Sequence, residues 1–178
     1  MTQAFAQFAE SEKNVRLEWE LLAFDALTPA VLKSFDKDTL KPIEGNRFPL
    51  LGRTAFMAAD RLIARAKVLR EDGVELYRPW MFMLSDGFTA DDMRDAAARL
   101  EAMEKEGELL YLPFKLTPKL LTERLQCLDR SKHIVEILQG QIDGFFAFVQ
   151  RMIEQRGALS PDVGIKFAKT DFEGWAVL

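Results

Sequence analysis

The chain is poor in the two residues that build most metal and thiol sites. It has one cysteine, Cys127, and one histidine, His133, among 178 residues. A single cysteine excludes an intrachain disulfide and a CxxC metal pair, and it is typical of a reducing compartment. A single histidine excludes a His-rich metal site. Cys127 stands near Leu125 and Leu128, so we expect it to fill space in a core. His133 follows Lys132, and we expect a partly exposed structural role.

Strong charge and long apolar runs are also missing. The net charge is −4 and the pI about 5.2, which gives no indication of nucleic-acid or anionic-membrane binding. No apolar run is long enough to cross a bilayer. The first ten residues lack the basic and apolar regions of a secretion signal. We therefore expect a soluble cytoplasmic domain. The basic clusters Lys115 with Lys119 and Arg130 with Lys132 are interpreted as solvated faces.

Several catalytic motifs are absent as well. The chain contains no GxGxxG and no GxxxxGK[ST], which excludes the usual dinucleotide and P-loop readings. It contains no HExxH, and no GxSxG accompanies its one histidine, so zinc-protease and serine-hydrolase motifs fail too.

The most informative stretch that is present runs from Tyr77 to Asp92. Arg78-Pro79 signals a turn, and five apolar residues follow, Trp80 to Leu84. Such a run is typical of a strand buried on both faces of a parallel sheet. It stops at Ser85-Asp86-Gly87, and Thr89 is placed as the N-cap of the next helix. Asp86 is therefore predicted at the carboxyl end of a central strand, the edge where open α/β sheets bind ligands.

Apolar periodicity along the chain predicts alternating strands and helices. An apolar stripe with Thr54 as N-cap predicts a helix over residues 55–71. Alternation implies parallel pairing and a three-layer α/β sandwich, with helices on both faces of a mainly parallel sheet. We expect one domain over residues 1–178, with a helical segment within residues 1–14 and a tail at 157–178 that packs back on it. The predicted strands are residues 15–24, 30–35 (an edge), 80–84, 109–114 and 133–138 (nearer an edge); the predicted helices are 2–12, 55–71, 90–106, 117–127 and 142–154; residues 163–168 and Trp175 are a further strand and an anchor.

Polar residues at the predicted strand ends are the candidate site. Hard oxygen ligands of this kind suit Mg²⁺ or Ca²⁺. The alternative is local structure: Asp25 and Asp86 in turns, Thr54 and Asp91 as helix caps. Glu101, Glu104, Glu106 and Glu108 are interpreted as a solvated helix face. The candidates are Asp25, Thr54, Ser85 and Asp86, with Asp91 and Asp92 nearby.

The stretch from Tyr77 to Asp92 resembles the "YRPWxFLLTDGxPTDD" segment of bacterial von Willebrand factor A domains, above all the small stand-alone kind associated with tellurite resistance and with phage or stress defence. Residues 15–25 resemble the strand that ends in "TFD" in that family, and residues 51–59 resemble its "GGTxxGxA" turn. Residues 145–149 resemble its "FFxWLS" helix, and Gly174-Trp175-Ala176 its "GWA" tail. The resemblance covers nearly the whole chain from about Val15.

The resemblance implies a metal-ion-dependent adhesion site, to which a bound partner adds a carboxylate. Thr54 and Asp86 match two of its metal ligands by position. The Asp-x-Ser-x-Ser loop that supplies the others in the family occurs nowhere in this sequence. Two oxygen ligands are few for the near-octahedral shell of Mg²⁺. We therefore expect a degenerate site, no cofactor or at most Mg²⁺, and binding of a protein partner through Asp25, Gly52, Arg53, Thr54, Ser85, Asp86, Gly87 and Phe88.

The strand that precedes this loop in the family is missing too. Its loss would leave two strand edges unpaired in the middle of the sheet. The flanking strands could close up, residues 163–168 could fill the slot, or another chain could donate a strand in a homo- or hetero-oligomer. We expect one of the first two; a start codon chosen too far downstream is a fourth explanation.

The resemblance makes a non-enzymatic protein-interaction domain the leading functional expectation. Two alternatives from other classes remain open. One is a Mg²⁺-dependent hydrolase or phosphotransfer enzyme that uses Asp25 and Asp86. The other is a structural subunit of a larger assembly.

Overall fold

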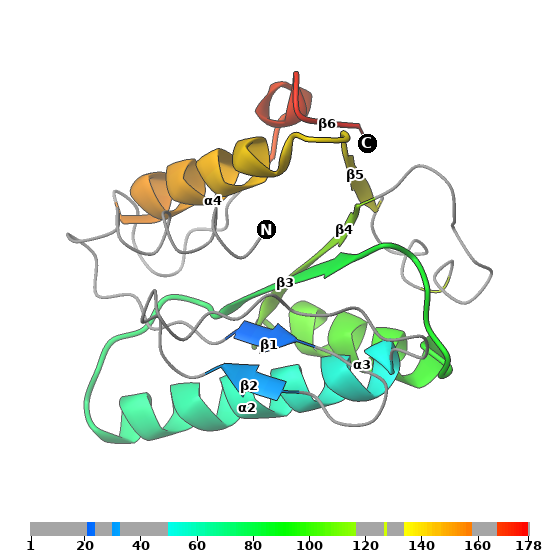
Figure 1. Cartoon of the computed structure of the whole chain (residues 1–178). Helices are drawn as coiled ribbons and strands as arrows, with labels where there is room; N and C mark the ends of the chain where they lie inside the picture. Colours follow the sequence, from blue (N-terminus) through cyan, green and yellow to red (C-terminus); the bar gives the residue numbers. More distant parts are fainter. Residues whose placement is uncertain are drawn as a thin grey trace.

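A computed structural model describes residues 21–23, 30–32, 50–116, 127, 134–157 and 167–177 (Figure 1). The described elements alternate between strands and helices over most of this range. In chain order they are β1 (Leu21–Ala23), β2 (Ala30–Leu32), α2 (Leu51–Glu71), β3 (Trp80–Ser85), α3 (Arg94–Lys105), β4 (Leu110–Lys115), β5 (Val135–Ile137), α4 (Ile142–Gly157), the 3-10 helix η1 (Lys169–Phe172) and β6 (Ala176–Val177).

The main sheet has four strands in the order β3-β4-β5-β6. β3 and β4 run parallel over six residue pairs, from Trp80 opposite Leu110 to Ser85 opposite Lys115. β4 and β5 are also parallel, and β6 adds to β5 in the antiparallel sense. β1 and β2 form a separate antiparallel hairpin. The sheet is thus mainly parallel, as the alternating pattern predicted.

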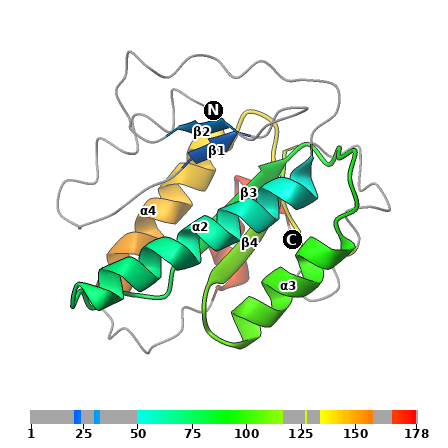
Figure 2. The same cartoon turned by 90° about the horizontal axis from the view of Figure 1, so that it is seen from below.

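Two hydrophobic clusters lie on opposite faces of this sheet. One combines β4 and β5 with α4 and the tail, and it includes Phe114, Phe148 and Trp175. The other combines β3 and β4 with α2 and α3, and it includes Met81. Because side chains alternate along a strand, Met81 faces one cluster while its neighbour Phe82 packs against the other. Figures 1 and 2 show α4 on one side of the sheet and α2 with α3 on the other, so the α/β architecture with helices on both faces is confirmed.

The most strongly patterned elements lie where the sequence predicted them. The apolar run at 80–84 is β3, the run at 109–114 is β4 shifted by one residue, and α4 covers the predicted closing helix. The segment at 133–138 contributes β5, which lies next to the edge strand β6, so the prediction of a strand nearer an edge is confirmed. Residues 21–23 and 30–32 are strands inside the predicted ranges, and β2 lies at an edge of its hairpin. The predicted helices at 2–12 and 117–127 fall outside the described residues, apart from Cys127.

Two predicted helix starts were wrong. α2 begins at Leu51, so Thr54 lies within its first turn, where its hydroxyl donates to the Leu50 carbonyl oxygen at 2.8 Å. α3 begins at Arg94, so Thr89 is not its N-cap. Both predictions relied on the usual preference of threonine for caps. In the fold, Thr89 caps α2, which begins 38 residues before it, and not the helix that follows it. A local sequence pattern does not contain this pairing.

The C-terminal tail returns to the domain, but through a later segment than predicted. Residues 167 and 168 are not in a strand, whereas Ala176 and Val177 form β6 on β5. Trp175 is 6% exposed, and its indole N–H donates to the Asp171 carbonyl oxygen at 2.8 Å. The prediction of Trp175 as an anchor is therefore confirmed. The rest of the predicted strand, residues 163–166, lies outside the described residues.

Among the described residues, no strand pairs with the outer edge of β3. β1, the described part of the strand predicted at 15–24, pairs with β2 and not with β3. The described part of the tail pairs with β5, at the far end of the sheet. The described residues thus place no strand in the slot, and residues 15–20 and 163–166, which belong to the two predicted intramolecular fillings, lie outside them.

Candidate functional site

The N-terminus of α2 is capped by side chains from the loop between β3 and α3. The Thr89 hydroxyl accepts a hydrogen bond from the Leu51 N–H at 3.2 Å. The Asp91 carboxylate accepts from the Gly52 N–H at 3.1 Å and from the Arg53 N–H at 2.8 Å. Thr89 also donates its hydroxyl proton to Asp91 at 2.5 Å. A carboxylate here satisfies free helix N–H groups and favours the positive end of the helix dipole.

Gly52 allows this close contact between the two loops. A Cβ atom at position 52 would lie 2.7 Å from the Asp92 carbonyl oxygen and 3.1 Å from an Asp91 carboxylate oxygen. The first neighbour is backbone and cannot swing away, so any larger residue would push the loops apart. Capping and close packing together hold the start of α2 against the loop that follows β3.

The turn after β3 is built by its own side chains. The Ser85 hydroxyl accepts from the Gly87 N–H at 3.1 Å, and the Asp86 carboxylate accepts from the Phe88 N–H at 3.0 Å. Gly87 has a φ of 93°, a conformation that residues with a Cβ rarely adopt. Asp86 thus makes the Asx-turn that was the structural alternative to a metal or catalytic role.

Most predicted site residues lie in the first turn of α2 or at the end of β3 and in the turn that follows it, and they differ in exposure. Arg53, Asp86 and Phe88 are exposed, with Phe88 44% exposed, whereas Thr54 and Ser85 are buried. Asp25 lies outside the described residues. We call the segments Gly52–Thr54 and Ser85–Phe88 together the two-loop surface. Its exposed side chains combine a cation, an anion and an aromatic ring.

The described residues of this surface do not fit a magnesium site. Thr54 uses its hydroxyl proton on Leu50 and is buried, and Asp91 is bound to two backbone N–H groups. Asp92 makes an ion pair with Arg94 at 2.5 Å. Within the part of the chain that the structure describes, no three His, Cys, Asp or Glu side chains are placed to hold a metal. Mg²⁺ needs about six oxygen ligands in a regular shell, and the described residues offer no cluster of carboxylates from which to build one.

A second polar group at the same sheet edge was missed by the sequence analysis. Lys115, expected on a solvated face, is 9% exposed, and its ammonium lies 2.8 Å from the Glu136 carboxylate on β5. Ser85, Lys115 and Glu136 occupy paired positions on β3, β4 and β5. Lys115 directly follows an apolar run, so it could have been recognised as the last residue of that strand. Glu136, its partner 21 positions further along, could not have been identified from the sequence.

Two further groups are shaped by their surroundings. Burial, with smaller effects from Cys127 and Glu104, raises the pKa of the Tyr111 hydroxyl above its usual range. The Tyr111 N–H donates to the Glu104 carboxylate at 3.5 Å, and the Arg78 guanidinium donates to the Glu104 carbonyl, so Glu104 is not simply part of a solvated face. At the exposed Arg94, a hydrogen bond to Asp92 raises the guanidinium pKa.

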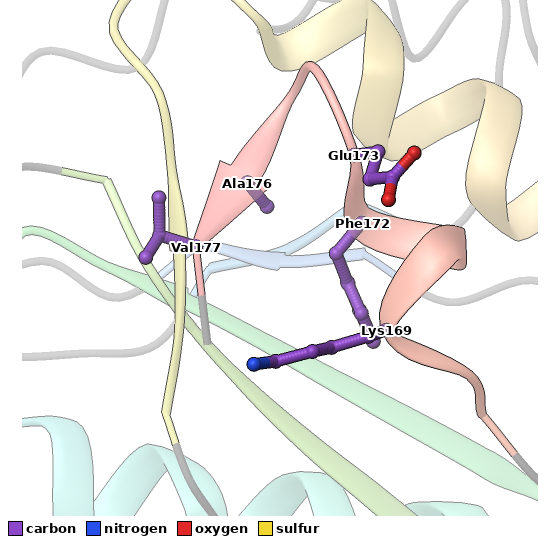
Figure 3. Close-up of a pocket in the computed structure, with 5 residues that line it drawn as sticks. All are labelled: Lys169, Phe172, Glu173, Ala176 and Val177. Atoms are coloured by element: carbon purple, nitrogen blue, oxygen red, sulfur yellow. The ribbon is translucent and has the colours of Figure 1, made fainter.

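A shallow hollow lies away from the two-loop surface, beside β6 (Figure 3). Its volume is about 250 Å³, and it is lined by Lys169, Phe172, Glu173, Ala176 and Val177. In the close-up Glu173 points away from the Lys169 ammonium. No convergent pair of charged groups is seen there, so the hollow offers no evident chemistry.

The fold and this site define the class of the protein: an α/β domain with a mainly parallel sheet and a polar loop surface beyond β3. The chain matches no known family model, no curated protein and no solved structure with significance. Among the described helices, none has the length and apolarity needed to cross a membrane.

Proposed function

We propose that the chain is a von Willebrand factor A-like domain that binds a protein partner without catalysing a reaction, through a degenerate adhesion site. The observation that carries the proposal is the direct attachment of the two loops that match the family's metal-binding loops. Thr89 and Asp91 tie the start of α2 to the segment after β3. A rigid loop surface on a sheet scaffold is a common way to build a binding site.

The exposed side chains of the two-loop surface suit recognition of a protein. Phe88 offers an apolar ring that is 44% exposed, and Arg53 and Asp86 place opposite charges on either loop. An aromatic residue surrounded by polar groups is typical of an interface anchor. Because the described residues bring no cluster of carboxylates together, we infer that binding does not depend on a metal.

The experiment is a comparison of partner retention from native extract of the source cell. The wild-type chain is immobilised beside Asp86→Ala, Phe88→Ala and a control, Val68→Ala. Val68 is as exposed as Phe88, at 44%, but lies in the last part of α2. We expect both loop variants to lose at least about tenfold in retained partner, as hot-spot truncations do, and Val68→Ala to retain it.

Chelation separates this proposal from an intact adhesion site and from a magnesium enzyme. Retention should be the same with and without EDTA, and calorimetric titration with Mg²⁺ or Mn²⁺ should give no binding heat. Retention that survives both loop substitutions would place the interface elsewhere. Metal binding that is lost with Asp86→Ala would instead support metal-assisted chemistry.

A further inference from the structure

The outer edge of β3 is a second surface, and the direction of its backbone N–H and C=O groups indicates what it can bind. We infer that it binds one extended segment of another polypeptide by β-strand addition. Within the described residues, β3 pairs with β4 on one side only and ends the four-stranded sheet. This surface is separate from the two-loop surface and makes a different kind of contact.

The direction of the backbone groups follows from the bonds at the two ends of the β3–β4 ladder. The Leu110 N–H donates to the Pro79 carbonyl at 2.7 Å, and the Leu116 N–H donates to the Ser85 carbonyl at 2.8 Å. Peptide groups alternate in direction along a strand, so every second residue from Pro79 to Ser85 faces β4.

The intervening residues, Trp80, Phe82 and Leu84, therefore point their N–H and C=O groups to the outer edge. No hydrogen bond connects these groups to any residue that the structure describes. A row of alternating donors and acceptors is complementary to the backbone of an extended chain. Side-chain ligands and small molecules do not match that repeat.

β3 lacks the features that usually protect an edge strand. It contains no charged residue and no proline over Trp80–Ser85, and its six-residue ladder with β4 has no bulge. Its side chains are apolar toward both helix layers, with Met81 and Met83 in one cluster and Phe82 packed against the other. An edge strand with the composition of a central strand can take a further apolar strand beside it under the same two helix layers.

The position of the β1–β2 hairpin favours a lone segment over a second copy of the chain. In both views the hairpin lies on the open side of β3 (Figures 1 and 2), and it belongs to a separate sheet. A second copy that offered its own β3 would bring β4 and two helices alongside and meet this hairpin. A single extended segment carries no such attachments.

The ends of the strand indicate the charge pattern of that segment. Arg78 precedes β3 and Asp86 follows it, whereas the strand between them is uncharged. Arg78 also donates to the Glu104 carbonyl and Asp86 accepts from the Phe88 N–H, so only their charges act on the ends of the segment. The complementary segment has about six apolar or β-branched residues, an acidic group near Arg78 and a basic group near Asp86.

The first test measures individual amide exchange by NMR on the whole protein at low concentration. We expect the N–H groups of Trp80, Phe82 and Leu84 to exchange at least about tenfold faster than those of Met81 and Met83. Slow exchange of all five amides would show that the edge is already filled and would overturn the proposal. Protection that increases with protein concentration, together with a dimer by light scattering, would assign the edge to a second copy and also overturn it.

The second test adds a probe peptide, end-capped, with six alternating valine and threonine residues between one glutamate and one lysine, made in both orders of charge. We expect saturable binding by fluorescence anisotropy and slowed exchange at Trp80, Phe82 and Leu84. A peptide with a central proline should bind at least about tenfold more weakly because it lacks a backbone donor. No binding of either peptide, or equal binding of the proline peptide, would contradict strand addition.

Matched variants locate the binding to this edge. Leu84→Lys places a charge on β3 where Leu84 packs against the α4 cluster. In a variant that circular dichroism shows to be folded, it should weaken the peptide at least about tenfold, as lysine does on natural edges. Val177→Lys places the same charge on β6, at the opposite edge of the sheet, where the side chain is 53% exposed, and should leave binding unchanged. Phe88→Ala should also bind the peptide normally, which separates a failure here from a failure of the two-loop surface.

Discussion

At the scale of single residues, the clearest feature is that Asp91 holds a helix other than the one it precedes. Its carboxylate caps α2, whereas the nearby α3 begins at Arg94. Asp91 was named from the sequence both as a nearby candidate ligand and as a possible helix cap. Only the cap is supported by its contacts, and the helix that it caps is distant in sequence.

Asp91→Ala should destabilise the protein by about 1–2 kcal/mol, because it removes two backbone partners at the start of α2. Asp92→Ala is the comparison: its carboxylate is bonded to the exposed Arg94, and a smaller loss is expected. Urea unfolding followed by circular dichroism measures both. Equal losses in the free energy of unfolding would contradict a special role of Asp91 in holding the start of α2 to the segment after β3.

Tyr111 should titrate only at very high pH, because burial disfavours its charged form. The unfolded hydroxyl ionises near pH 10, so its contribution to stability is complete below that pH and is lost as pH rises above it. The measurement is tyrosinate absorbance in a Tyr77→Phe variant, which leaves Tyr111 as the only tyrosine. We expect ionisation well above the usual range or only on unfolding. Ionisation near pH 10 in a folded protein would contradict the buried placement.

At the scale of elements, the C-terminal tail is held by α4 and β5 together. Trp175 packs 5.3 Å from Phe148 between ring centroids, and the Leu138 N–H donates to the Trp175 carbonyl at 2.8 Å. The tail therefore closes the aromatic cluster on this face of the sheet and adds β6 at its far edge.

Gly144→Ala should loosen this tail. The added Cβ would lie 2.3 Å from the Trp175 Cβ and 2.7 Å from its Cγ, so either α4 or the tail must shift. Overpacking of this kind costs about 1–3 kcal/mol. Thermal unfolding and tryptophan emission report it. Ala147→Ser adds one heavy atom at an exposed site on the same helix and should change neither; an unchanged midpoint for Gly144→Ala would contradict the packing.

At the scale of the whole molecule, the two hydrophobic clusters are joined through shared strands. Residues of β4 occur in both: Phe114 in one cluster and Tyr111 in the other. Unfolding of β4 would expose the apolar side chains of both clusters to solvent. We therefore expect the described part of the chain to unfold as one cooperative unit.

Two probes test that expectation in one urea series. In a Trp19→Phe variant, tryptophan emission reports the cluster that contains Trp175 and against which Trp80 packs. Thiol labelling of Cys127 reports the cluster against which Cys127 packs. The two midpoints should coincide. The labelling control is the fully denatured chain, in which Cys127 should react at the rate of a free thiol. Midpoints separated by more than about 0.5 M urea, roughly a 0.5–1.5 kcal/mol difference in stability, would show that the two faces unfold separately.

The fold class could be predicted from this sequence because its signals are local. The apolar run at Trp80–Leu84 is β3, the α4 segment carries a continuous apolar stripe, and the strands alternate with helices. Period, composition and turn residues act within a few positions, so they can be read without knowing the rest of the fold. The position of Asp86 at the carboxyl end of β3 follows from the same signals.

What only the tertiary structure decided is which groups meet. Asp91 and Thr89 cap a helix that begins 38 residues or more before them, and Lys115 finds Glu136 on the next strand. Each of these side chains can form its hydrogen bond or ion pair with a neighbour in sequence or with a distant residue. Which partner it finds depends on how the backbone is packed. The sequence by itself determined that β3 is apolar on both faces. Only the fold showed that, within the described residues, one of its edges has no strand beside it. Strand pairing is a property of neighbours in space, and sequence order does not specify it.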